Sequence, residues 1–153
     1  MLSVRMVGRI RTSLTRTNAR AALCGLACGA VLAVAPGASA ERMPAEQAKA
    51  LQNPVAYAPE AVKAGRNAYL RLCQYCHGAD GRAQANPDFE APSLRDPDEW
   101  RYGATDGEIF VSIRDGAGHE MPPFGKQLQD DEIWRVVLFI RSIGPKELRP
   151  QTP

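Results

Sequence analysis

Cys73-Gln74-Tyr75-Cys76-His77 is the stretch that decides the fold of this 153-residue chain. It has the form C-x-x-C-H, in which two thiols lie about one helical turn apart and can each add to one vinyl group of a porphyrin. The imidazole of His77 then lies under the iron, where it can bind as the proximal ligand. The motif therefore predicts one covalently attached haem c, with Cys73 and Cys76 as its attachment points and His77 as an iron ligand.

Other uses of the two thiols fit the sequence less well. A disulfide between Cys73 and Cys76 would close a small ring at a helix end and add little stability. A thioredoxin-like redox pair needs a βαβ context, which the sequence does not have. A zinc site needs two further ligands, and His119 is the only cysteine or histidine outside the motif after residue 40.

A second iron ligand can be sought among the methionines. After residue 40 the chain has only Met43 and Met121. Met121 stands before a Pro-Pro-Phe sequence, in which the prolines prevent a helix and stiffen the backbone. Because a stiff loop suits a thioether that must be presented to iron, Met121 is the predicted second ligand. His119, two residues earlier, is the rival, since imidazole also binds iron.

Three helices are predicted around the motif, at residues 59–74, 105–116 and 130–143. In each of them apolar residues recur at three- and four-residue spacing. A capping box at Thr105 begins the second helix, and a Gly-Pro pair stops the third. Residues 78–104 are rich in glycine and proline and are expected to form a long loop. No stretch shows sustained period-two alternation, so the predicted fold class is all-α.

Such a chain would have a thin hydrophobic core. Three short helices and a long loop must order roughly 90 residues, and loops of that length usually serve a ligand. A large apolar cofactor would fill the centre, so we expect the helices and the loop to wrap around one haem. The expected domains are a flexible lead-in at 41–58, the haem domain at 59–145 and a C-terminal tail at 146–153.

The first 40 residues have the parts of an export signal. A basic stretch without acidic residues precedes a short apolar run at 21–35, and an Ala-Ser-Ala cleavage pattern ends at Ala40. The apolar run is shorter than the ~20 residues that a spanning helix needs, and an uncleaved membrane anchor is the alternative. We expect a signal peptide at 1–40, cleaved near Ala40, and a periplasmic, oxidising location for the remainder.

The net charge of +2 comes from this first segment. Its five charged residues are all arginine, so the remaining chain has 14 basic and 17 acidic residues, a net charge of −3. Two haem propionates would make it more negative. This charge argues against nucleic acid as a partner, and we expect redox protein partners with a basic contact surface.

The stretch from about 59 to 145 resembles a class I cytochrome c. The resemblance rests on the order of helix, C-Q-Y-C-H-G, loop, helix, M-P-P-F and an aromatic-bearing helix. It implies the small all-α cytochrome c fold, Cys73 and Cys76 as thioether attachment points, and His77 and Met121 as axial ligands.

The resemblance also implies contacts around the haem. Members of the family pack a glycine and an aromatic residue of the first helix against an aromatic residue of the last, and Gly65, Tyr69 and Phe139 match those positions. A proline carbonyl of the loop accepts the N–H of the proximal histidine, a role that Pro92 matches, and Leu94 would then pack on the haem. Apart from the resemblance, three polar or aromatic side chains of the loop could donate hydrogen bonds to the haem propionates, namely Trp100, Arg101 and Tyr102. For Trp100 the alternative is packing as a core aromatic residue.

The predicted function is that of a monomeric, periplasmic one-electron carrier that cycles between Fe(III) and Fe(II) and binds its partners transiently. Iron with two protein ligands has no vacant position for a substrate, so the chain is not expected to be an enzyme. One alternative is a haem-bearing subunit of a periplasmic dehydrogenase complex. Another is a haem enzyme or ligand sensor, in which Met121 leaves the sixth position open.

Overall fold

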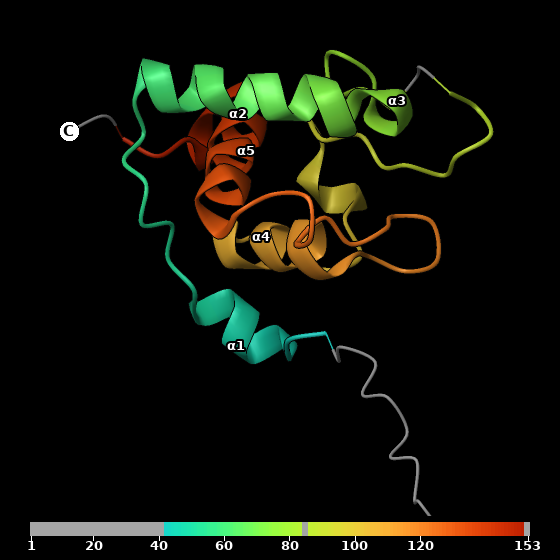
Figure 1. Cartoon of the computed structure of the whole chain (residues 1–153), viewed down its shortest axis with the longest axis horizontal. Helices are drawn as coiled ribbons and strands as arrows, with labels where there is room; N and C mark the ends of the chain where they lie inside the picture. Colours follow the sequence, from blue (N-terminus) through green and yellow to red (C-terminus); the bar gives the residue numbers. More distant parts are fainter. Residues whose placement is uncertain (1–41, 84–85, 152–153) are drawn as a thin grey trace, which may run out of the picture. The chain divides into compact units, whose positions relative to one another are not determined.

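The computed structural model describes residues 42–83 and 86–151, so the predicted signal peptide lies outside the described residues. Within these ranges the structure has helices and loops but no strand, and Ala117 and Met121 form an isolated bridge. The predicted all-α fold is thereby confirmed. The helices of Figure 1 are α1 (Ala45–Ala50), α2 (Pro59–Leu72), α3 (Gln74–His77), α4 (Asp106–Asp115) and α5 (Asp130–Ile143), with single 3₁₀ turns η1 (Pro97–Glu99) and η2 (Lys146–Leu148).

Helices α2 and α5 pack closely against each other (Figure 1). Gly65 makes the close approach possible, because a Cβ atom at this position would lie 1.8 Å from the carbonyl oxygen of Arg135. One turn further along, the fully buried Tyr69 places its ring centroid 4.8 Å from that of Phe139. Its hydroxyl donates to the carbonyl of Gly78 at 2.6 Å. The structure thus brings together the three residues that the resemblance had grouped.

Replacing Gly65 with alanine should destabilise the protein by about 3 kcal/mol, at the upper end of the range for overpacking, because the added methyl group meets helix backbone that cannot rotate away. The measurement is guanidinium unfolding of the haem-loaded protein. Asn67→Ala, at an exposed position of the same helix, is the control and should not lower the midpoint, because alanine is the better helix former. Equal midpoints for both variants would contradict the close packing of α2 on α5.

Helix α4 is joined to α5 through an aromatic stack and an ion pair. Phe110 stacks on Trp134 with ring centroids 4.1 Å apart. The buried Arg141 donates to Asp106 Oδ1 and to the carbonyl of Ala104, both at 2.6 Å. This pair is only slightly exposed, so losing either partner would leave a poorly compensated charge inside the protein.

Both of these helices begin with a capping box. The predicted one at the start of α4 pairs Thr105 with Glu108, each side chain accepting a hydrogen bond from the other's backbone N–H. A second box, between Gln129 and Glu132, begins α5. This second box was not expected from the sequence, because glutamine is not among the preferred N-cap residues.

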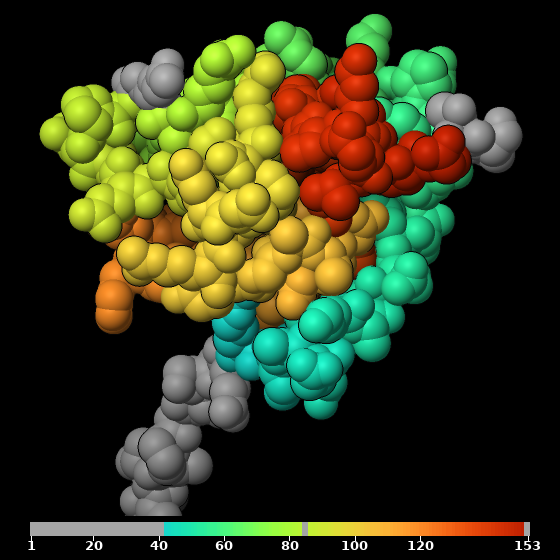
Figure 2. All heavy atoms as spheres, turned by 180° about the vertical axis from the view of Figure 1, so that it is seen from behind, coloured from blue at the N-terminus to red at the C-terminus, as the bar shows by residue number. Residues whose placement is uncertain are grey.

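The lead-in differs from the flexible segment that the sequence suggested. Residues Ala45–Ala50 form α1, which packs on α4 and buries Ala48. Gly107 admits this helix, because a Cβ atom there would lie 1.9 Å from the carbonyl oxygen of Ala48. Pro44 stands at the N-cap, directly before the first residue of this helix. Figure 2 shows, from behind, the residues after 42 lying against α4.

The carboxylate of Asp115 helps to hold the lead-in. It accepts two hydrogen bonds from Arg114, at 2.7 and 2.9 Å, and one from the backbone N–H of Met43 at 3.4 Å. The bonds from Arg114, and to a smaller extent the one from Met43, hold the pKa of Asp115 below its ordinary value. A carboxyl with a lowered pKa in the folded state stabilises that state above its unfolded pKa of about 4, and the contribution is lost as the pH falls through the folded value.

Asp115→Asn should therefore be less stable than the wild type at pH 7, and the difference should shrink as the pH falls from about 5 to below 4. Denaturant midpoints of the two proteins, measured at several pH values, give this difference directly. Acid effects elsewhere in the molecule act on both proteins and cancel. A difference that stays constant across this range would show that the charge of Asp115 contributes nothing.

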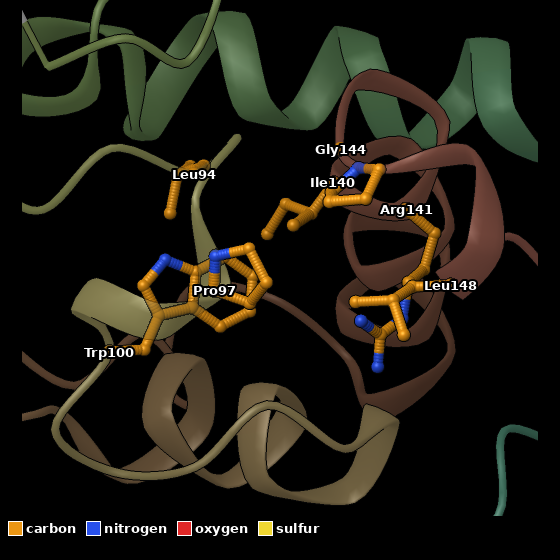
Figure 3. A pocket seen from close by; sticks show the side chains of 8 residues that line it. Leu94, Pro97, Trp100, Ile140, Arg141, Gly144 and Leu148 are labelled. Atoms are coloured by element: carbon orange, nitrogen blue, oxygen red, sulfur yellow. The ribbon is translucent and has the colours of Figure 1, made fainter.

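The long loop is held by hydrogen bonds within itself and packs against the end of α5. The backbone N–H of Leu94 donates to the carbonyl of Gly81 at 2.7 Å, and Trp100 Nε1 donates to the carbonyl of Ser93 at 2.7 Å. The space left between loop and helix is about 10 Å³, no more than one water molecule needs. Figure 3 shows the side chains around it, from Leu94, Pro97 and Trp100 on the loop to Ile140, Arg141, Gly144 and Leu148 near the C-terminus.

Candidate functional site

A cavity of about 520 Å³ lies between the helices and the long loop. Its walls come from α2 and α3, the loop, α4, the segment after α4, and α5. This volume is within the range of small-molecule and cofactor sites. All six site residues expected from the sequence line it, namely Cys73, Cys76, His77, Pro92, Leu94 and Met121.

The two cysteines lie where α2 passes into α3. The sequence predicted one helix to about residue 74, but the backbone departs from helical geometry at Cys73 (φ −114°, ψ −29°) before α3 begins at Gln74. Both thiols are free, so the disulfide is not formed. Burial, reinforced by Cys76, raises the pKa of the Cys73 thiol to about 12. The Cys73 thiol therefore stays protonated at neutral pH. Cys76 lines the same wall of the cavity.

His77 is buried, and its tautomer is set by a backbone contact. Its Nδ1 lies 3.2 Å from the carbonyl oxygen of Pro92. A carbonyl oxygen only accepts, so Nδ1 carries the proton and Nε2 keeps its lone pair. Burial lowers the pKa of His77, although the bond to Pro92 acts in the opposite direction. The ring is therefore neutral at neutral pH, with a nitrogen available to a metal.

Met121 reaches the cavity from the loop after α4. This loop leaves α4 at Gly116, whose φ of 85° suits glycine. Ala117 and Met121 then pair through two backbone hydrogen bonds of 3.0 and 3.4 Å, and Phe124 N–H donates to the carbonyl of Ile113 at 2.9 Å. The loop is thus tied to the last turn of α4 at both of its ends.

The other methionine, Met43, and the rival ligand, His119, lie in different places. Met43 does not line the cavity, and its backbone is bound to Asp115. His119 does line the cavity, but it is an exposed residue near the tip of the same loop.

The remaining walls are mostly apolar. The cavity is lined by apolar residues from the apolar faces that the sequence predicts for two helices. They are Ile109 and Ile113 of α4 and Val136 and Ile140 of α5. Trp100, Arg101 and Tyr102 line it as well, but the indole N–H of Trp100 is used by Ser93. Other lining residues, such as Phe89, Glu90 and Ser112, were not expected from the sequence, because nothing in their local pattern marks them.

The residues present fit a covalently bound haem. The cavity holds two free thiols, an imidazole nitrogen with a lone pair and, from another segment, a thioether sulfur. Sulfur and imidazole ligands of this kind suit iron. By contrast, residues 42–83 and 86–151 contain no group of three or more histidine, cysteine, aspartate or glutamate side chains that could hold another metal. Within those two ranges the zinc alternative therefore finds no such ligand group.

An all-α fold built around a cavity with C-x-x-C-H in its wall is that of a class I c-type cytochrome. Residues 60–140 match the family described as "Cytochrome C oxidase, cbb3-type, subunit III". The chain belongs to this family of cytochrome c domains, and its cofactor is haem c with its iron.

Similar proteins agree with this assignment. The chain is 30% identical over 99 residues to the "Cbb3-type cytochrome c oxidase subunit FixP" of Sinorhizobium medicae, a match that covers 59% of this chain and 32% of that protein. It is 32% identical over 92 residues to a "Thiosulfate dehydrogenase" of Stutzerimonas stutzeri, a match that covers 58% of this chain and 28% of that protein. The chain thus spans about a third or less of the length of these two relatives.

The solved structure of cytochrome cL from Methylophaga aminisulfidivorans is similar with a TM-score of 0.51 and 30% identity, covering 64% of this chain and 62% of that one. This likeness agrees with the cytochrome c fold. Among the described helices of our chain, none is both long and apolar enough to cross a membrane.

Proposed function

We propose that this chain is a one-electron carrier of the cytochrome c type. The observation that supports the proposal is the meeting of Cys73, Cys76, His77 and Met121 in the wall of one cavity of about 520 Å³. When bound, haem c supplies the Fe(III)/Fe(II) couple.

His77 and Met121 are the proposed iron ligands. The carbonyl of Pro92 fixes the imidazole by accepting a hydrogen bond from its Nδ1–H, which leaves Nε2 for the metal and raises its basicity. Leu94 lies in the wall of the same cavity, where its apolar side chain would pack on the haem. A thioether ligand and an apolar pocket both favour the less charged Fe(II) and raise the reduction potential. With His77 and Met121 both bound to the iron, no coordination site would be left for a substrate.

The proposed location is the periplasm, and the export-signal pattern of the first 40 residues supports it. The proposed partners are redox proteins that bind transiently to this monomer through a small interface. Three acidic side chains, Glu90, Glu99 and Glu120, line the haem cavity. They support a partner with a basic contact surface, as the net charge of −3 after residue 40 also does.

A spectroelectrochemical titration of the purified holoprotein tests this proposal. We expect a reversible transition that follows a one-electron Nernst curve, with identical optical spectra after repeated cycles. A transition that is irreversible, or that changes the ligand spectrum in each cycle, would argue against a carrier.

A second candidate is a haem-bearing subunit that stays bound to a larger enzyme. The observation in its favour is that relatives of this domain are parts of longer proteins named as an oxidase subunit and a dehydrogenase. Size exclusion of a native extract, followed by haem absorbance, distinguishes the two. Elution at the size of the monomer favours the free carrier, and elution with a larger protein favours the subunit.

A further inference from the structure

The side chain of Arg42 joins three segments at the edge of the haem cavity. Its Nη1 donates to the carbonyl of Gly116, and its Nη2 donates to Ser112 Oγ at 2.9 Å. Its guanidinium also lies 4.5 Å from the ring centroid of Tyr102. These partners belong to the base of the Met121 loop, to α4 and to the end of the long loop. The planar guanidinium suits this task, because it donates in two directions while its face stacks on a ring.

Each of these partners is next to the site. Ser112 and Tyr102 line the cavity themselves. Gly116 packs against the backbone of Met121, since a Cβ atom at Gly116 would lie 2.8 Å from the carbonyl oxygen of Met121. A Cβ atom at Gly118 would lie 3.2 Å from the hydroxyl of Tyr102, so Tyr102 also lies close to the Met121 loop.

The position of Arg42 is fixed by the lead-in that follows it. The N–H of Met43 is bound to Asp115, and α1 buries Ala48 against the bare backbone of Gly107. The guanidinium is therefore held at this edge by a docked segment. Because the docking already orders the backbone of Arg42, little further conformational entropy is lost when its side chain binds.

We propose that Arg42 is a positioning residue for Met121: by holding the Gly116 carbonyl, Ser112 and Tyr102 together, it keeps the Met121 loop closed over the haem cavity. This inference rests on the proposed role of Met121 as an iron ligand. It gives the residues just before α1 a part in the site, although they are far from it in sequence.

The test is the rate at which CO binds to the reduced holoprotein, which reports how often the methionine ligand leaves the iron. Arg42→Met keeps the length and the apolar stem of the side chain but removes both donors. We expect CO to bind at least ~10-fold faster than to the wild type, a ratio that corresponds to about 1.4 kcal/mol. Arg66→Met, at an exposed position of α2, is the matched control and should bind CO at the wild-type rate.

A second measurement separates loop opening from global unfolding. Guanidinium titrations should show that Arg42→Met loses the methionine–iron charge-transfer band at a lower concentration than its helical circular dichroism, whereas the two transitions coincide more closely in the wild type. If the loss of the charge-transfer band and the loss of helical circular dichroism move to lower guanidinium concentration by the same amount, Arg42 has only a general structural role and the inference is overturned.

Arg42→Lys separates the geometry from the charge. Lysine keeps the positive charge but lacks the planar fork, so CO binding should still be faster than in the wild type. A wild-type rate in Arg42→Lys, or in Arg42→Met, would overturn the inference. If the wild type itself lacks the charge-transfer band and binds CO readily, it is the proposed ligand role of Met121 that fails.

Discussion

Met121→Ala should lower the reduction potential by on the order of 0.1 V or more, within the ~0.8 V range that axial ligands span. A thioether favours Fe(II), and alanine offers the iron no replacement. The same change should let the reduced protein bind CO at neutral pH and should abolish the methionine–iron charge-transfer band of the oxidised form. Spectroelectrochemistry and a CO titration measure these effects.

Met43→Leu is the control, because Met43 is the other methionine after residue 40 and does not line the cavity. Its potential and spectrum should match the wild type. If Met121→Ala changes neither the potential nor CO binding, the ligand is not Met121. His119→Ala would then be the variant to measure, since His119 lies in the same loop and also lines the cavity.

The Cys73→Ser/Cys76→Ser variant should lose covalent haem and, with it, most of its folded structure. The reason is the size of the cavity, about 520 Å³. At ~24 cal/mol for each Å³ left empty, such a cavity costs on the order of 10 kcal/mol, which rivals the net stability of a whole domain. Water entering the open cavity reduces this cost, but the apolar walls contributed by α4 and α5 would still lose their packing partner.

Two measurements check this prediction. Mass spectrometry under denaturing conditions should find the haem mass on the wild type and not on the double variant. Far-ultraviolet circular dichroism should show that the double variant has lost most of its helical signal. Tyr75→Ser, at an exposed position between the two cysteines, is the control and should keep both the haem and the helices. A haem-free variant that unfolds cooperatively at the wild-type midpoint would contradict the claim that the cofactor fills the core.

Much of the site was predictable because its chemistry depends on local spacing. Cys73, Cys76 and His77 are adjacent in sequence, and the stiff loop around Met121 is marked by its prolines. The three main helices follow from apolar periodicity and from the Thr105 capping box, and their observed ends lie within two residues of the predicted ones. Gly65, Tyr69 and Phe139 came from the resemblance alone, since no local pattern pairs residues that far apart.

The parts that sequence reasoning missed depend on tertiary partners. The lead-in forms a docked helix because Gly107 has no side chain to keep Ala48 away, and nothing near residue 48 indicates this. Trp100 uses its indole N–H within its own loop, a choice that composition cannot reveal. Arg42 belongs to the cavity edge only because the chain returns there 70 residues later, at Ser112.

The optical spectrum of the purified wild-type protein tests the central claim, that His77 and Met121 hold the haem iron of an electron carrier. We expect the oxidised form to show a methionine–iron charge-transfer band, and the reduced form to leave its spectrum unchanged when CO is added at neutral pH. A reduced form that binds CO readily, together with an oxidised form without that band, would contradict the claim and favour a haem enzyme or a ligand sensor.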